Sequence, residues 1–194
     1  MIANILRTET AQNHKELESL MFVNEIMNNS LSINDYKKLL TINYLIHQAL
    51  ENKLISMLDE NIASKLDLNV PIKLNALIRD IDFWNIDKET LPKPNFDFYV
   101  PEKDNTEVLG ALYVLEGATL GGNVIKKYIL ANPNFKNFDG GLNYYGVYGN
   151  ELGSKWKNFV QILNEEVKEI DFDKCVRSAN ETFGNLIKLS KQLN

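Results

Sequence analysis

The stretch EGATLGG, residues 116–122, lies inside a long apolar segment that otherwise has the pattern of a helix from about 105 to 130. It holds three of the chain's ten glycines, and a glycine inside a helix costs roughly 1 kcal/mol relative to alanine. Positions 110, 117 and 121 fall within about 40° of one another on a helix, so they form one bare strip. The strip predicts either close helix packing through Gly117 and Gly121 or a large flat ligand lying on the backbone. The successive Gly121 and Gly122 also allow the helix to bend.

The rest of the chain also has helical periodicity, with no period-two alternation. We expect helices over 2–20, from Ser32 with an N-capping box to about 57, from Pro71 to Trp84, over 153–168, and from 173 to the C-terminus. Residues 85–104 hold three of the five prolines and predict a long connection packed on the core. The pattern therefore predicts an all-α fold in a single domain, 1–194.

Composition limits the partners. The 194 residues are 44% hydrophobic and carry a net charge of −5, so no overall field attracts nucleic acid. Glu116, Thr119 and Asn123 interrupt the apolar stretch, which argues against a membrane span. Residues 1–12 lack the apolar region of a secretion signal, and the single Cys175 is compatible with a reducing compartment. We expect a cytoplasmic protein.

A flat ligand needs a group on its other face, and the chain has two histidines. His14 lies on the first helix, with Arg7 two turns earlier on a similar face. A neutral imidazole is the usual protein ligand of heme iron, although a histidine at such a position is also compatible with an ordinary surface residue. His47 lies within an apolar helix, which favours a hydrogen-bonded core histidine.

Four segments carry a resemblance to heme oxygenases. Residues 6–18, LRTETAQNHKELE, are similar to the family's proximal helix, and residues 113–129, YVLEGATLGGNVIKKYI, to its distal helix. GLNYYGVYGNELGSKWKNF, 141–159, and SANETFGNL, 178–186, agree as well. The similarity is closest to the bacterial, biliverdin-producing branch found beside bacteriophytochromes.

The resemblance implies an all-α, heme oxygenase-like fold with heme between the first helix and a kinked distal helix. It implies His14 as the proximal iron ligand and Gly117, Gly121 and Gly122 as the catalytic distal glycines. The propionate ligands and the aromatic residue that packs on the heme would then be Arg7, Lys157 and Phe183. The animal branch has an aspartate where this chain has Ala118. Glu116 is turned about 200° away from position 118 on a helix and cannot simply replace that aspartate; Tyr113 is another nearby polar group.

The implied reaction is oxidative cleavage of heme b, both substrate and cofactor, by O2 to biliverdin, iron and carbon monoxide. Electrons would come from an external reductase, such as a ferredoxin or flavin reductase, because the chain has no dinucleotide or flavin fingerprint. A phytochrome is an expected recipient of the biliverdin. The alternatives are a non-catalytic heme carrier or sensor, another small-molecule enzyme on the same fold such as a thiaminase-like protein, and a helix-packing role for the glycines.

Overall fold

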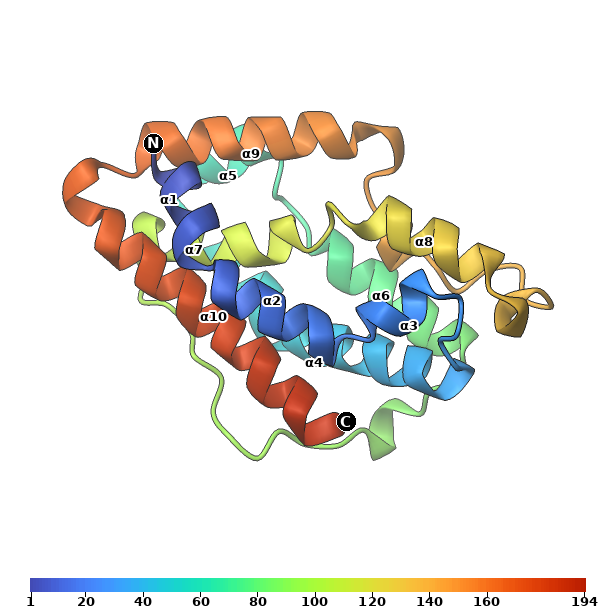
Figure 1. Ribbon diagram of the computed structural model, residues 1–194. Coiled ribbons are helices and arrows are strands. Elements are labelled where there is room, and N and C mark those ends of the chain that lie inside the picture. Colours follow the sequence, from blue (N-terminus) through green and yellow to red (C-terminus); the bar gives the residue numbers. More distant parts are fainter.

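The computed structural model describes all 194 residues and is all-helical, as the sequence predicts, with no strand (Figure 1). Its α-helices are α1 Ile2–Glu9, α2 Ala11–Leu20, α3 Val23–Met27, α4 Ile33–Met57, α5 Glu60–Leu66, α6 Ile72–Phe83, α7 Asn105–Gly117, α8 Gly122–Ala131, α9 Leu152–Glu166 and α10 Phe172–Leu193. Short 3-10 turns join them: η1 Lys88–Thr90, η2 Pro133–Phe135, η3 Tyr144–Gly146, η4 Gly149–Glu151 and η5 Glu169–Asp171.

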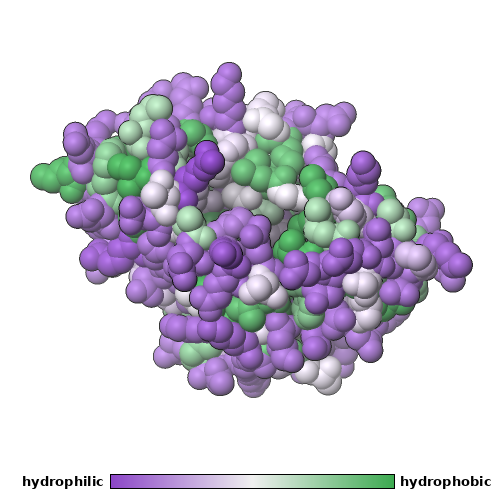
Figure 2. Space-filling model, in the orientation of Figure 1, coloured by the Kyte–Doolittle hydropathy of each residue, from purple (hydrophilic) through white to green (hydrophobic).

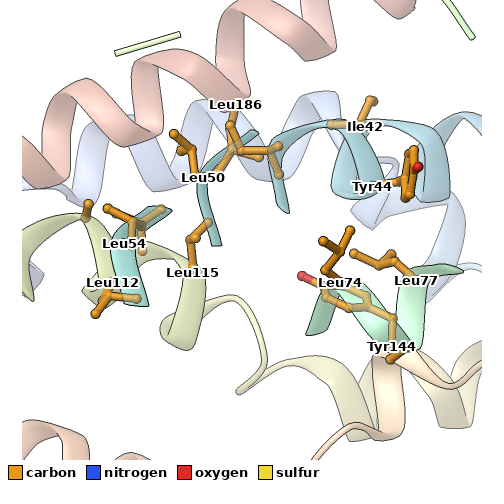
Figure 3. Close-up of a cluster of buried hydrophobic side chains, with 14 of the residues drawn as sticks. Ile42, Tyr44, Leu50, Leu54, Leu74, Leu77, Leu112, Leu115, Tyr144 and Leu186 are labelled. Carbon is orange, nitrogen blue, oxygen red and sulfur yellow. The ribbon is translucent and has the colours of Figure 1, made fainter. Parts of the chain in front are cut away.

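The long helices pack around one hydrophobic core of 42 buried residues. The C-terminal helix α10 packs along α7 and α2, and α4 packs against α6, α7 and α10 (Figure 1). Figure 3 shows part of this core, where side chains of α4, α6, α7 and α10 meet. This packing brings α2, α7 and α10, which are far apart in the sequence, next to one another.

Local signals set the helix starts that the sequence predicts. The Ser32 hydroxyl accepts a hydrogen bond from the Asp35 backbone N–H at 3.1 Å and starts α4. Asp104 caps α7 in the same way. The short helices α3 and α5 lie in segments without a long apolar period, so the sequence analysis does not find them.

The predicted helix over 2–20 is broken into α1 and α2 at Thr10. The buried Thr10 hydroxyl donates a 2.7 Å hydrogen bond to the Leu6 carbonyl oxygen, one turn earlier. Threonine hydroxyls that bond back to this carbonyl often bend a helix. The break therefore has a local cause that apolar periodicity does not reveal.

The predicted glycine-rich helix over 105–130 is likewise two helices, α7 and α8, separated by a turn at residues 118–121. Backbone N–H groups of Thr119, Leu120 and Gly122 bond three residues back instead of four, which tightens the chain there. By length and composition alone, Asn105–Ala131 is apolar enough to cross a membrane, a test that core helices also pass. In this fold α7 is a core helix whose residues 107–112 and 114–116 are buried.

A tight loop before η3 depends on glycine. Gly140 and Gly141 have φ of +151° and +70°, conformations that side-chain-bearing residues rarely adopt. The Gly141 carbonyl oxygen accepts hydrogen bonds from the Tyr36 hydroxyl and the Trp84 indole N–H, at 2.8 and 2.9 Å. The buried Asp80 carboxylate accepts from the backbone N–H of Tyr144 at 2.8 Å. These bonds fix η3 against α4 and α6.

Candidate functional site

A cleft of about 730 Å³ opens between α1, α2, α7, α9 and α10. Its size is that of a small-molecule or cofactor site. Figure 2 shows this face, where a hollow bordered by apolar side chains has a hydrophilic rim. The lining residues are Arg7, Thr10, Ala11, His14, Lys15, Leu17, Glu18, Tyr113, Val114, Gly117, Ala118, Leu120, Trp156, Phe183 and Leu186.

His14 supplies the one imidazole of the cleft. Its side chain is 62% exposed, and Nδ1 lies 3.6 Å from the Glu18 carboxylate, one turn later on α2. The ring meets that of Phe183 edge-on, with centroids 6.2 Å apart. No protein group hydrogen-bonds Nε2. A carboxylate beside one ring nitrogen leaves the other free to bind a metal, because it favours the tautomer protonated on its own side.

The wall provided by α7 is bare backbone. Gly117 lines the cleft, and a Cβ added there would lie 3.7 Å from the Trp156 ring, an ordinary contact. Ala118 follows it on the same wall. Gly117 does not have a positive φ, so the backbone conformation does not require a glycine there. The lack of a side chain leaves space in the cleft. A flat ligand between His14 and this wall would meet no large side chain from α7 at that point.

The structure gives the other glycines different surroundings. A Cβ on Gly122 would lie 2.9 Å from the Tyr145 carbonyl oxygen, and one on Gly110 2.4 Å from that of Cys175. Close packing therefore explains both, which corrects the idea of one ligand-facing strip. Gly121 is exposed and lines neither the cleft nor the cavity beside it. Of the three predicted distal glycines, the structure brings only Gly117 to the cleft.

Two cations line the cleft. Arg7 is at one end, close enough to lower the pKa of Tyr113, although burial raises that pKa more. Lys15 follows His14 directly, and neither cation makes an ion pair with a protein carboxylate. The predicted Lys157 is exposed on α9 and does not line the cleft. Its neighbour Trp156 lines the cleft instead. Adjacent side chains on a helix point about 100° apart, so the prediction of Lys157 did not indicate Trp156.

A smaller cavity of about 120 Å³ adjoins the cleft and shares His14, Leu17, Glu18 and Ala118 with it. Asn43 of α4 and Tyr144 and Tyr145 of η3 contribute its other polar groups. The remaining lining is apolar and comes from α2, α3, α4 and α8. The chain therefore has polar side chains close to position 118 that come from distant segments.

Behind this cavity lies a buried polar cluster. The Lys73 ammonium, fully buried, is 3.1 Å from Glu51 and 2.7 Å from Glu116. Burial lowers the Lys73 pKa, but the two carboxylates raise it more, so the ammonium stays charged. The Tyr148 hydroxyl donates to Glu116 at 2.8 Å. Glu116 thus points into the core, which confirms that it does not take the place of a side chain at 118.

The Glu51 carboxylate also caps the N-terminus of α6. It accepts hydrogen bonds from the backbone N–H groups of Lys73 and Leu74 at 3.1 and 2.7 Å, at the start of that helix. Burial raises the Glu51 pKa, but His47, Lys73 and the Leu74 N–H lower it more, to about 2. No local pattern predicts these contacts, because they join residues from three separate helices.

His47 is 1% exposed and hydrogen-bonded in the core, as predicted. Its Nδ1 lies 3.2 Å from Glu51 Oε2 and its Nε2 3.3 Å from the Tyr144 hydroxyl. Both ring nitrogens therefore have partners. This leaves His14 as the histidine with a nitrogen free for a ligand.

A cleft lined by a histidine and by a bare helix wall is consistent with the comparison with known protein families. The heme oxygenase family model matches residues 1–192. The chain belongs to the heme oxygenase family. No curated protein matches it by sequence.

Solved heme oxygenases share the fold at low sequence identity. Heme oxygenase-1 from the cyanobacterium Synechocystis sp. PCC6803, solved in complex with heme, is 20% identical, with a TM-score of 0.74 over 100% of this chain and 92% of that one. The heme oxygenase from Neisseria meningitidis is 19% identical, with a TM-score of 0.73 and the same coverage of both chains. The heme oxygenase from Leptospira interrogans is 20% identical, with a TM-score of 0.74 over 98% of both chains. The whole chain therefore has the heme oxygenase fold.

The residues of the cleft fit a heme. A porphyrin is flat and apolar with two carboxylates at one edge, and the cleft offers apolar walls and the unpaired cations Arg7 and Lys15. His14 can hold the iron, and Gly117 leaves the opposite face clear. The sequence resemblance finds His14, Arg7, Gly117 and Phe183 of this set. The resemblance does not identify Lys15. The signal for Lys15 in the sequence is its position directly after His14.

Proposed function

We propose that the chain cleaves heme oxidatively to biliverdin, iron and carbon monoxide, using O2 and electrons from an external reductase. The observation that carries the proposal is the cleft in which His14 lies across from the bare Gly117 wall. Membership of the heme oxygenase family supports it. Heme supplies the redox chemistry, because its own iron activates dioxygen, and the protein supplies binding and orientation.

Each lining residue has a defined task in this proposal. His14 would hold the iron, and Glu18, 3.6 Å from Nδ1, would orient the ring. Arg7 and Lys15 bind the two carboxylates and so fix how the heme is rotated about the iron. The small Gly117 and Ala118 leave room on the opposite face for dioxygen near the porphyrin edge. Phe183 packs against His14 and excludes water from that side.

The test is a heme titration followed by turnover. Purified protein is titrated with ferric heme, and the complex is given O2 with a ferredoxin or flavin reductase as the electron source. Loss of the Soret band with formation of a bilin and carbon monoxide supports the proposal. Tight heme binding without breakdown would replace it with a heme carrier or sensor, and no heme titration at all would favour a different small-molecule enzyme on this fold.

We further propose a cytoplasmic site of action and, from the resemblance to the branch beside bacteriophytochromes, a phytochrome as recipient of the bilin. The single, buried Cys175 supports the location. Adding the apo-phytochrome to the turnover mixture tests the second point. Covalent attachment of the product, seen as a far-red absorbing holoprotein, is the expected result.

A further inference from the structure

The smaller cavity beside Ala118 is large enough for a few water molecules, at about 30 Å³ each in the liquid. Three polar side chains line it away from the main cleft: Asn43, Tyr144 and Tyr145. The Asn43 amide donates to the Leu39 carbonyl oxygen at 2.8 Å, while its own oxygen accepts no protein hydrogen bond. Tyr144 is the second, and its hydroxyl has one protein partner, His47. The cavity therefore has polar partners for water on the side of the cleft where position 118 lies.

Glu51, His47 and Tyr144 form a hydrogen-bonded chain that ends at this cavity. Glu51 Oε2 is 3.2 Å from His47 Nδ1, and His47 Nε2 is 3.3 Å from Tyr144 Oη. All three are buried. A carboxylate, an imidazole and a hydroxyl in this order form the arrangement by which proteins move a proton to or from the hydroxyl. The backbone of Tyr144 is fixed by Asp80, so the hydroxyl cannot move away with the loop.

Charged groups from three helices surround His47. On its own helix α4 it faces Glu51, and across the cluster lie Lys73 of α6, Glu116 of α7 and the Tyr148 hydroxyl. Asp80 of α6 adds a carboxylate on the far side of Tyr144. Two carboxylates, Glu51 and Glu116, thus share the one Lys73 ammonium. Lys73 offsets one of these two negative charges, and His47 lies beside one member of the carboxylate pair, Glu51.

We propose that Glu51, His47 and Tyr144 are a proton relay that supplies the cavity beside Ala118, in place of a carboxylate at position 118. The proposal rests on the heme-cleaving function above. In the delivery step the Tyr144 O–H bond breaks as its proton passes to water in the cavity, and the Nε2 proton of the His47 imidazolium moves to Tyr144 Oη. His47 becomes neutral with Nδ1–H still donated to Glu51. One proton leaves the relay in the step, and cavity water returns a proton between turnovers, so the three residues act as a stored acid beside position 118.

The protonation state of His47 sets the direction in which the Tyr144 hydroxyl donates. With a neutral ring, Glu51 holds the proton on Nδ1, so Nε2 accepts and the hydroxyl hydrogen points back into the core. With an imidazolium, Nε2 donates to Tyr144 Oη and the hydroxyl hydrogen is free for the cavity. Burial raises the Tyr144 pKa well above its ordinary value, so the hydroxyl does not lose its proton unless His47 replaces it.

The first test uses heme-free protein. The chain has two histidines, so a His14→Ala background leaves His47 as the only imidazole in a ¹⁵N NMR spectrum. The expected neutral form has the proton on Nδ1, and Tyr144→Phe shifts the Nε2 resonance. Glu51→Gln should shift the Nδ1 resonance, because it replaces the carboxylate 3.2 Å from Nδ1 with an amide. A neutral form protonated on Nε2, or a spectrum insensitive to Tyr144→Phe, overturns the relay.

The second test uses the heme complex at several pH values. Tyr144→Phe and His47→Gln should slow heme breakdown about 100-fold without changing heme affinity, and the pH profile of the rate in both should differ from that of the wild type. Tyr44→Phe is the matched control: it removes a hydroxyl on the helix of His47 whose bond is to Gln48. Wild-type rates and pH profile in Tyr144→Phe overturn the relay and leave the heme-cleaving function intact. An inactive wild type with the expected heme-free spectra overturns that function alone.

Discussion

Gly117 and Gly122 lie on opposite sides of the bend between α7 and α8, and a methyl group at each should have opposite effects. At Gly122 the new Cβ would lie 2.9 Å from the carbonyl oxygen of Tyr145 and 3.4 Å from its carbonyl carbon. These are backbone atoms of the fixed η3 turn, so they cannot rotate away. At Gly117 the new Cβ would lie 3.7 Å from the Trp156 ring, an ordinary contact.

The magnitudes follow from these distances. Overpacking against a rigid neighbour costs about 1–3 kcal/mol, and for a chain of this size each kcal/mol moves the Tm by roughly 2–4 °C. Gly122→Ala should therefore lower the heme-free Tm by about 2–12 °C. Gly117→Ala should raise it by about 1–4 °C, because alanine in a helix is about 0.5–1 kcal/mol better than glycine and meets no clash.

Circular dichroism melting of the heme-free variants measures these effects, and a heme titration gives the second readout. Gly117→Leu should keep the heme-free Tm but weaken heme binding at least about tenfold, the equivalent of 1.4 kcal/mol, because the side chain enters the cleft. Gly121→Leu is the control, since Gly121 is exposed and outside the cleft. Equal stability losses at 117 and 122 would refute the assignment of one glycine to the ligand and the other to packing.

Three further outcomes are expected. His14→Ala should keep its helical content but lose the heme complex spectrum, with recovery on added imidazole; an unchanged absorption spectrum would contradict iron binding by His14. Replacing Arg7 and Lys15 with alanine should weaken heme affinity and change the biliverdin isomers resolved by chromatography, whereas Lys157→Ala should do neither, because Lys157 is outside the cleft. The Glu51 pKa falls from 4.5 to about 2 on folding, so its contribution of about 3 kcal/mol is complete above pH 4.5 and is lost as the pH falls towards 2. Acid unfolding followed by fluorescence should therefore be less steep in Glu51→Gln than in the wild type.

The sequence predicts the long helices well because their signals are local. The capping of α4 by Ser32 and the start of α6 after Pro71 are encoded within a few residues. The break at Thr10 is missed, because apolar periodicity continues through it, whereas the break between α7 and α8 is predicted as a bend by the successive Gly121 and Gly122. A bend of this kind depends on one hydroxyl or on a tightened turn, which changes the path of the chain but not its pattern.

The candidate site is predicted in part for a similar reason. The spacing of Arg7 and His14 predicts that they lie near each other, and both line the cleft although the helix is broken between them at Thr10. The Glu51, Lys73 and Glu116 cluster joins α4, α6 and α7, and only the packed fold brings these charges together. The sequence also does not distinguish a glycine that leaves room for a ligand from one that allows close packing. Gly117 and Gly122 differ only in the neighbour that a Cβ would contact in the folded chain.

The helix that carries His14 has a dynamic consequence. None of the residues of α2 is fully buried, whereas α7 is almost entirely core. Local opening costs least where few apolar contacts must be broken, so amide hydrogens of α2 should exchange with solvent long before those of α7 in the heme-free protein. A bound porphyrin would cover the inner side of α2 and slow that exchange. The substrate itself would then complete the hydrophobic interior of this part of the chain, and its cleavage and release would return α2 to its loosely held state.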